Sequence, residues 1–118
     1  MAETIKSLSK SEEVVMKAIL DLADKEGSLV LESVRVTELI EHLKIYGKNY
    51  KRTTVVTFLA RLESKGAIQT YRIGRYSYVL PQYSLWAYRK KLVNQMINFW
   101  YAGNIEKLIE EVKGHEKA

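Results

Sequence analysis

The stretch from Tyr50 to Pro81 constrains the fold most, because the spacing of its apolar residues changes from helical to strand-like at Gly66. Beyond Gly66, apolar and polar residues alternate, and Ile73-Gly74-Arg75-Tyr76 has the form of a tight turn. The pattern predicts one helix, over residues 52–65, followed by a two-stranded hairpin. Before the glycine, the apolar residues at helical spacing are Val55, Phe58, Leu59 and Leu62.

The outer face of this predicted helix carries small side chains in place of long charged ones. Threonine lowers helix stability through its stiff χ1 angle, so a face that meets only solvent usually carries Glu, Lys or Gln. Small hydroxyl and methyl groups suit a helix that lies against base edges in a DNA major groove. The alternative is that these side chains pack on a neighbouring element, and we favour the groove. The residues of this face are Thr53, Thr54, Val56, Thr57, Ala60, Arg61 and Ser64.

The predicted hairpin has strands over residues 67–73 and 76–80. Pro81 ends the second strand, because proline has no N–H to donate to a sheet. Arg72 and Arg75 lie near the tip, where they can reach a phosphate or enter a minor groove. The candidate DNA-binding residues of helix and hairpin are therefore Lys48, Lys51, Arg52, Thr53, Thr54, Val56, Thr57, Arg61, Arg72 and Arg75.

The distribution of charge agrees with a nucleic-acid partner. The net charge is +5, and Glu63 is the one acidic residue between Glu41 and Glu106. A basic middle region after a more acidic first third is expected of a chain with one face against a polyanion, although a solvated basic surface would look the same. The bases of this interval are Lys44, Lys48, Lys51, Arg52, Arg61, Lys65, Arg72, Arg75, Arg89, Lys90 and Lys91.

The segments before Tyr50 predict the scaffold of the domain. Ser9-Lys10-Ser11-Glu12 has the form of a capping box, which marks a helix start. The predicted elements are a helix over 10–25 that ends at Gly27, a short strand over 28–34 that pairs with the hairpin, and a second helix over 36–44. Together they predict a mostly helical α+β fold: a winged helix-turn-helix domain, of three helices and a small antiparallel sheet, over residues 1–82.

The rest of the chain, residues 83–118, predicts a helical arm that forms a homodimer. Its first helix carries two adjacent apolar stripes, too wide for a helix that packs on one side only. A second copy of the same helix is the simplest partner. Ala102-Gly103-Asn104 breaks the chain, and a last helix follows with Ile105, Leu108, Ile109 and Val112 inward. The other candidate dimerisation residues are Leu85, Trp86, Tyr88, Leu92, Val93, Met96, Ile97, Phe99 and Trp100.

The composition argues against several other classes of protein. The chain has no cysteine, so it has neither a disulfide nor a thiolate metal site. The two histidines, His42 and His115, lack a second ligand at metal spacing, and we expect both at the surface. No nucleophile–base set or glycine-rich phosphate loop is evident, so we expect that the chain is not an enzyme and binds no cofactor. The chain shows neither a signal peptide nor a membrane span, and we expect a cytoplasmic protein.

Several motifs resemble the penicillinase repressor family of bacterial transcription regulators (BlaI/MecI/CopY). L-S-K-S-E-E-V-V-M-K-A-I-L, residues 8–20, resembles the family's opening helix, and R-T-T-V-V-T-F-L-A-R-L-E-S-K-G, residues 52–66, resembles its recognition helix. Residues 74–78 with Pro81 look like its wing, and Tyr88 with residues 99–103 looks like its dimerisation arm.

The resemblance implies a homodimeric repressor that binds double-stranded, palindromic operator DNA through the major groove. Thr54 and Thr57 would then lie at the DNA surface, with Arg75 in the wing. By the same resemblance, the residues near phosphates would be Lys51, Arg52 and Arg61.

The chain also departs from the family pattern. Val56 stands where relatives often carry a basic or polar residue, and it could contact a thymine methyl instead. The copper-sensing branch of the family carries a C-terminal cysteine motif. This chain has no cysteine, so we do not expect copper to release it from DNA. Glu111-Val112 occupies the place of the Asn-Phe bond that a protease cuts in the β-lactam branch.

Two other classes of function stay open on the sequence. One is a regulator of MarR or PadR type, with a small-molecule effector of unknown identity bound among the aromatic residues near the arm. The other is a winged helix that serves only as a protein-interaction module, which predicts no salt-dependent DNA binding.

Overall fold

The computed structural model describes residues 6–26 and 28–117, with side chains up to residue 114. Contacts divide the chain into two compact units, one ending at Leu85 and the other beginning at Trp86. Within the described residues, no helix is both long and apolar enough to cross a membrane. The elements are α1 (Lys10–Ala23), β1 (Val34–Arg35), α2 (Val36–His42), the 3-10 helix η1 (Leu43–Tyr46), α3 (Arg52–Ser64), β2 (Ile68–Ile73), β3 (Tyr76–Pro81), α4 (Leu85–Trp100) and α5 (Ile105–Lys117).

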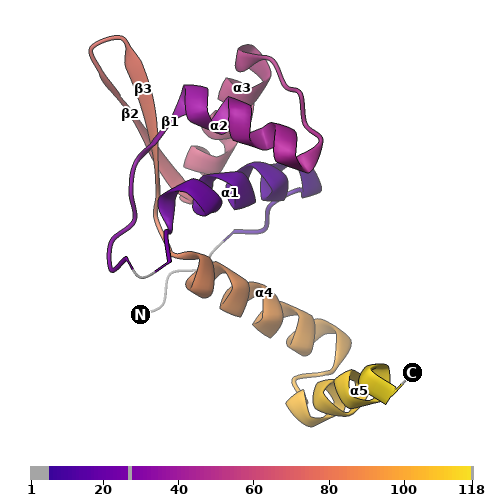
Figure 1. Cartoon of the computed structure of the whole chain (residues 1–118). Helices are drawn as coiled ribbons and strands as arrows, with labels where there is room; N and C mark the ends of the chain where they lie inside the picture. The colour runs from indigo at the N-terminus through magenta and orange to yellow at the C-terminus, as the bar shows by residue number, and fades with distance from the viewer. Residues whose placement is uncertain (1–5, 27, 118) are drawn as a thin grey trace. The chain divides into compact units, whose positions relative to one another are not determined.

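The first unit is the mostly helical α+β fold that the sequence predicts, a three-helix cluster with a small antiparallel sheet (Figure 1). α1 is its centre, since it packs against α2, α3 and β3. Met16, Ile19 and Leu20 of α1 are completely buried. Leu39, Leu43, Leu62 and Ile68 complete this core from the surrounding elements.

The start of α1 is the predicted capping box. The Ser9 hydroxyl accepts from the Glu12 backbone N–H at 3.2 Å, and the Glu12 carboxylate accepts from the Ser9 backbone N–H at 2.8 Å. The same carboxylate forms an ion pair with Lys65 at 2.6 Å, so the box also ties α1 to the end of α3. The hydrogen bond from Lys65 holds the pKa of Glu12 below its usual value. α1 itself ends at Ala23, two residues earlier than predicted, and Gly27 lies outside the described residues.

The sheet has the order β1-β3-β2, and both pairings are antiparallel. The prediction that an early strand pairs with the hairpin is confirmed, but the strand lies at Val34–Arg35 and not over 28–34. Val34 lies opposite Val79, and Arg35 lies opposite Tyr78. Val34 and Val79 are buried, whereas residues 28–30 are exposed and outside the sheet. The β2–β3 hairpin extends beyond the helices of this unit (Figure 1).

The second helix is shorter than predicted. α2 ends at His42, and the chain continues as η1 to Tyr46, where Gly47 adopts a left-handed conformation with φ 72°. Glycine adopts this conformation without steric cost, so the chain can turn sharply here before α3. His42 is not the surface residue that the sequence suggested, since it is half-buried and its Nε2 lies 3.0 Å from the carboxylate of Asp21.

The second unit contains α4 and α5, joined by the predicted break. Ala102 and Gly103 both have positive φ, and the Asn104 side chain accepts from the Glu106 backbone N–H at 3.0 Å to cap α5. The apolar face of α5 that was predicted to point inward is only partly covered in the single chain, where Leu108 is half-buried. Ile105, Ile109 and Val112 are each about half exposed, at 54%, 45% and 50%.

Candidate nucleic-acid interface

The outer face of α3 carries a narrow strip of small side chains. Thr53, Val56, Thr57 and Ala60 follow the i, i+3, i+4, i+7 spacing and are all exposed, with Val56 at 49%. The Thr57 hydroxyl donates to the Thr53 carbonyl at 3.0 Å, which fixes its rotamer and leaves its lone pairs outward. Thr54 lies beside the strip and is half-buried, so it presents less surface than the other threonines.

Two arginines lie on opposite flanks of this strip. At 3.6 residues per turn, Arg52 and Arg61 are about half a turn apart around the helix axis, one on each side of the strip. Arg61 lies on the Phe58 side, with its Cζ 5.7 Å from the centroid of that ring. Both are exposed, and an α-helix with a basic residue on each flank can reach both phosphate backbones of a groove.

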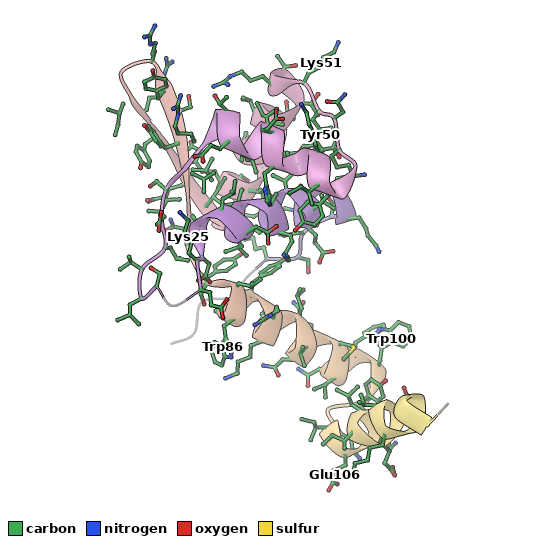
Figure 2. All side chains as sticks on the ribbon, in the orientation of Figure 1. Lys25, Tyr50, Lys51, Trp86, Trp100 and Glu106 are labelled. Carbon is green, nitrogen blue, oxygen red and sulfur yellow. The ribbon has the colours of Figure 1, made fainter. Side chains whose placement is uncertain are left out.

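The N-terminal end of α3 is basic and uncapped. Its N-cap residue is Lys51, whose side chain makes no capping hydrogen bond, and the first turn has no acidic residue. The positive end of the helix dipole therefore lies beside two cations, Lys51 and Arg52. Figure 2 shows Lys51 at this outer end of α3. Lys48, in the preceding turn, is half-buried.

Polar contacts fix the hairpin to α3, and an aromatic pair stiffens the hairpin itself. Glu63 on α3 accepts hydrogen bonds from the backbone N–H and the hydroxyl of Thr70 on β2, both at 2.9 Å. The rings of Tyr71 and Tyr78 stack across the two strands with centroids 5.3 Å apart, and the Tyr71 hydroxyl donates to Ser33. These contacts border a groove of about 360 Å³ between α3 and the hairpin.

Arginines from three parts of the first unit meet at the wing. A cavity of about 460 Å³ is lined by Arg35, Thr37, Arg52, Arg72, Arg75, Tyr76 and Ser77. Arg52, Arg72 and Arg75 were predicted from the sequence, and the structure brings these three together. Arg35 was not predicted, because its proximity depends on the pairing of β1 with β3. Among the described residues, no carboxylate lines this cavity, and none forms an ion pair with any of the four arginines.

The remaining predicted DNA-binding residues lie away from this cavity. Thr53, Val56 and Thr57 form the strip on α3, and Arg61 lies on its far flank. The interface candidates therefore form a band on the first unit: Arg61, then the strip, then the arginines of the wing.

The second unit exposes much of its apolar surface. Phe99 and Trp100 are 77% and 73% exposed, with ring centroids 4.9 Å apart in an edge-to-face arrangement. Figure 2 shows Trp86 and Trp100 near the two ends of α4. Of the predicted dimerisation residues, Tyr88 and Ile97 are buried, and Leu85 and Leu108 are half-buried. The exposed ones are Trp86, Leu92, Val93, Met96, Phe99, Trp100, Ile105 and Ile109.

Comparison with known families gives a match over most of the chain. Residues 8–118 match the family model described as penicillinase repressor. A search among curated proteins gave no match.

Proposed function

This chain belongs to the penicillinase repressor family, and we propose that it is a transcriptional repressor that binds a palindromic operator as a homodimer. The observation that supports this function best is the surface of α3. A strip of small hydroxyl and methyl groups lies between two arginines on opposite flanks, at an uncapped, basic helix end. Such a helix fits a major groove, where small side chains approach base edges and flanking cations meet phosphates.

The two parts of this surface have different roles in the proposal. Lys51, Arg52 and Arg61 bind phosphates and supply affinity that depends little on sequence. Thr53, Val56 and Thr57 face the bases and supply discrimination, with the Val56 methyl groups suited to a thymine methyl. Because Thr54 is half-buried, we place it at the edge of the base-contacting surface and not at its centre.

The proposed dimer follows from the exposed apolar surface of α4 and α5. Large apolar side chains on two successive helices are unfavourable in water, and burying each one is worth roughly 1.5–3 kcal/mol. A second copy of this unit would cover the same residues on both partners by two-fold symmetry. Two recognition helices related by that axis would read an inverted repeat. Repression would then follow from occupation of the promoter.

Selection from a random double-stranded DNA library, at near-physiological salt, tests this function. We expect an enriched inverted repeat with a defined spacing between its halves. Retention of DNA without an enriched motif would show a purely electrostatic binder. No retention at all would contradict the proposal and favour a protein-interaction role for the winged helix.

A further inference from the structure

Arg35 lies at the junction of β1 and α2, where it is half-buried against the hairpin. Its Cζ is 4.1 Å from the centroid of the Tyr76 ring, a close cation–π contact. The register explains the contact. Arg35 pairs with Tyr78, so Tyr76 is its diagonal neighbour on β3, within reach of a long side chain.

The Tyr76 ring also holds a second guanidinium, since the Cζ of Arg75 lies 5.7 Å from its centroid. Arg52 and Arg72 line the same cavity, so four arginines border one space. Like charges that share one cavity repel one another, and no carboxylate among the described residues of its lining offsets them. An anion is the species that such a cluster would bind.

The donors around the cavity indicate which anion it suits. Guanidinium groups present paired N–H donors that match the oxygens of a phosphate group, and Thr37 and Ser77 add hydroxyl donors. The site lies between the basic start of α3 and the wing, on the surface that the proposed function turns toward DNA. A backbone phosphodiester therefore suits the site better than a free anion.

We propose that Arg35 binds a phosphate of the DNA backbone on the wing side of α3, and that Tyr76 is the residue that positions it. Arg52, Arg72 and Arg75 complete the same site. This inference rests on the proposed function, because it presupposes that α3 lies in a groove. The site extends the interface to β1, whose residues show no sign of DNA binding in the sequence.

The test measures binding of the full chain to the selected operator and to random duplex DNA over a range of salt concentrations, by fluorescence anisotropy. For Arg35→Gln we expect about tenfold weaker binding to both DNAs, as for the loss of a hydrogen-bonded charge. The slope of log affinity against log salt should fall by about 0.9, the value for one phosphate contact. Lys25→Gln removes the same charge from an exposed pair with Glu32 and should leave both quantities nearly unchanged.

Two variants at Tyr76 test its positioning role. Tyr76→Phe keeps the ring and should keep both the affinity and the salt slope. Tyr76→Leu removes the ring and should reproduce part of the Arg35→Gln loss. In the Arg35→Gln background it should cost less than alone, because the residue it positions is gone. Equal costs in both backgrounds would contradict a positioning role, and thermal melting of each variant separates a folding defect from a binding defect.

The outcomes separate this inference from the proposed function. If the unmodified chain binds no DNA, the proposed function fails. If it binds and Arg35→Gln binds equally well with the same salt slope, only the phosphate site fails. A loss confined to the operator would show that Arg35 reads bases and would overturn the assignment. Specific competition by inorganic phosphate at constant ionic strength, lost in Arg35→Gln, would assign the site to a free anion instead.

Discussion

The carboxylate of Glu63 on α3 accepts two hydrogen bonds from Thr70 on β2, one from its backbone N–H and one from its hydroxyl, each 2.9 Å long. This relationship explains why one acidic residue stands in the long basic interval of the sequence. The negative charge of Glu63 repels DNA, yet its two hydrogen bonds hold the hairpin in place beside α3. Removing the Glu63 charge should therefore raise the affinity for DNA and lower the discrimination between DNA sequences.

Replacing Glu63 by Gln tests that opposition. The variant removes a negative charge from the proposed interface, so its affinity for random DNA should rise by a fewfold. Its preference for operator over random DNA should fall, because a neutral amide holds Thr70 less firmly. Binding titrations with both DNAs measure the two effects. An unchanged ratio between them would show that the contact does not align the wing for recognition.

Val56 should recognise a thymine methyl group. In the selected operator, replacing thymine by uracil at the contacted position removes that methyl. Binding should weaken about fourfold, because burying one methyl-sized group contributes about 0.8 kcal/mol. Val56→Ala should abolish the sensitivity to this replacement. If the variant keeps the same sensitivity as the original chain, Val56 does not contact that base.

Arg61 should bind a phosphate on the flank of α3 opposite the wing. Arg61→Gln should weaken binding to all DNA sequences by a similar factor and reduce the salt slope by about 0.9. Titrations with the operator and with single-base variants of it provide the comparison. A change in the ranking of these sequences would instead indicate a base contact.

The ion pair between Glu12 and Lys65 should make the free energy of unfolding depend on acid pH. The pKa of Glu12 is lowered in the folded state, so its contribution is complete above its unfolded value near 4.5 and is lost as pH falls through the folded value. Glu12→Gln should lower the free energy of unfolding by about 1–2 kcal/mol near pH 7. The loss is smaller than for a fully buried ion pair, because Lys65 is partly exposed. The difference from the original chain should shrink toward pH 3 in urea titrations. Glu13→Gln, which removes the neighbouring charge, is the matched control.

The exposed apolar surface of α4 should hold two copies together. Leu92, 38% exposed, lies on that surface, and Leu92→Asp should shift the sedimentation of the protein to that of a monomer. Asn94→Asp adds the same charge at another exposed position of α4, outside the apolar stripes, and should leave the dimer intact. Unchanged helical circular dichroism would show that both variants fold. A Leu92→Asp protein that remains dimeric would place the interface elsewhere.

Much of the fold followed from local patterns in the sequence. The capping box at Ser9, the helix before Gly66 and the hairpin turn at Gly74 each depend on residues within a few positions of one another. The structure places them where the periodicity predicts, to within two residues.

The parts that sequence reasoning missed depend on long-range contacts. β1 is two residues long, so its position follows from pairing with β3 and not from its own propensity. Arg35 meets Tyr76 only through that pairing. The half-burial of Thr54 depends on neighbours across the fold, which helical spacing alone does not reveal.

The most direct test of the central claim, that the outer face of α3 lies in a major groove, is a hydroxyl-radical footprint on the selected operator. We predict two protected half-sites related by two-fold symmetry, each with protected backbone on both sides of one major groove and further protection beside it from the wing. Protection that follows a minor groove alone, or a single unrepeated site, would contradict this account.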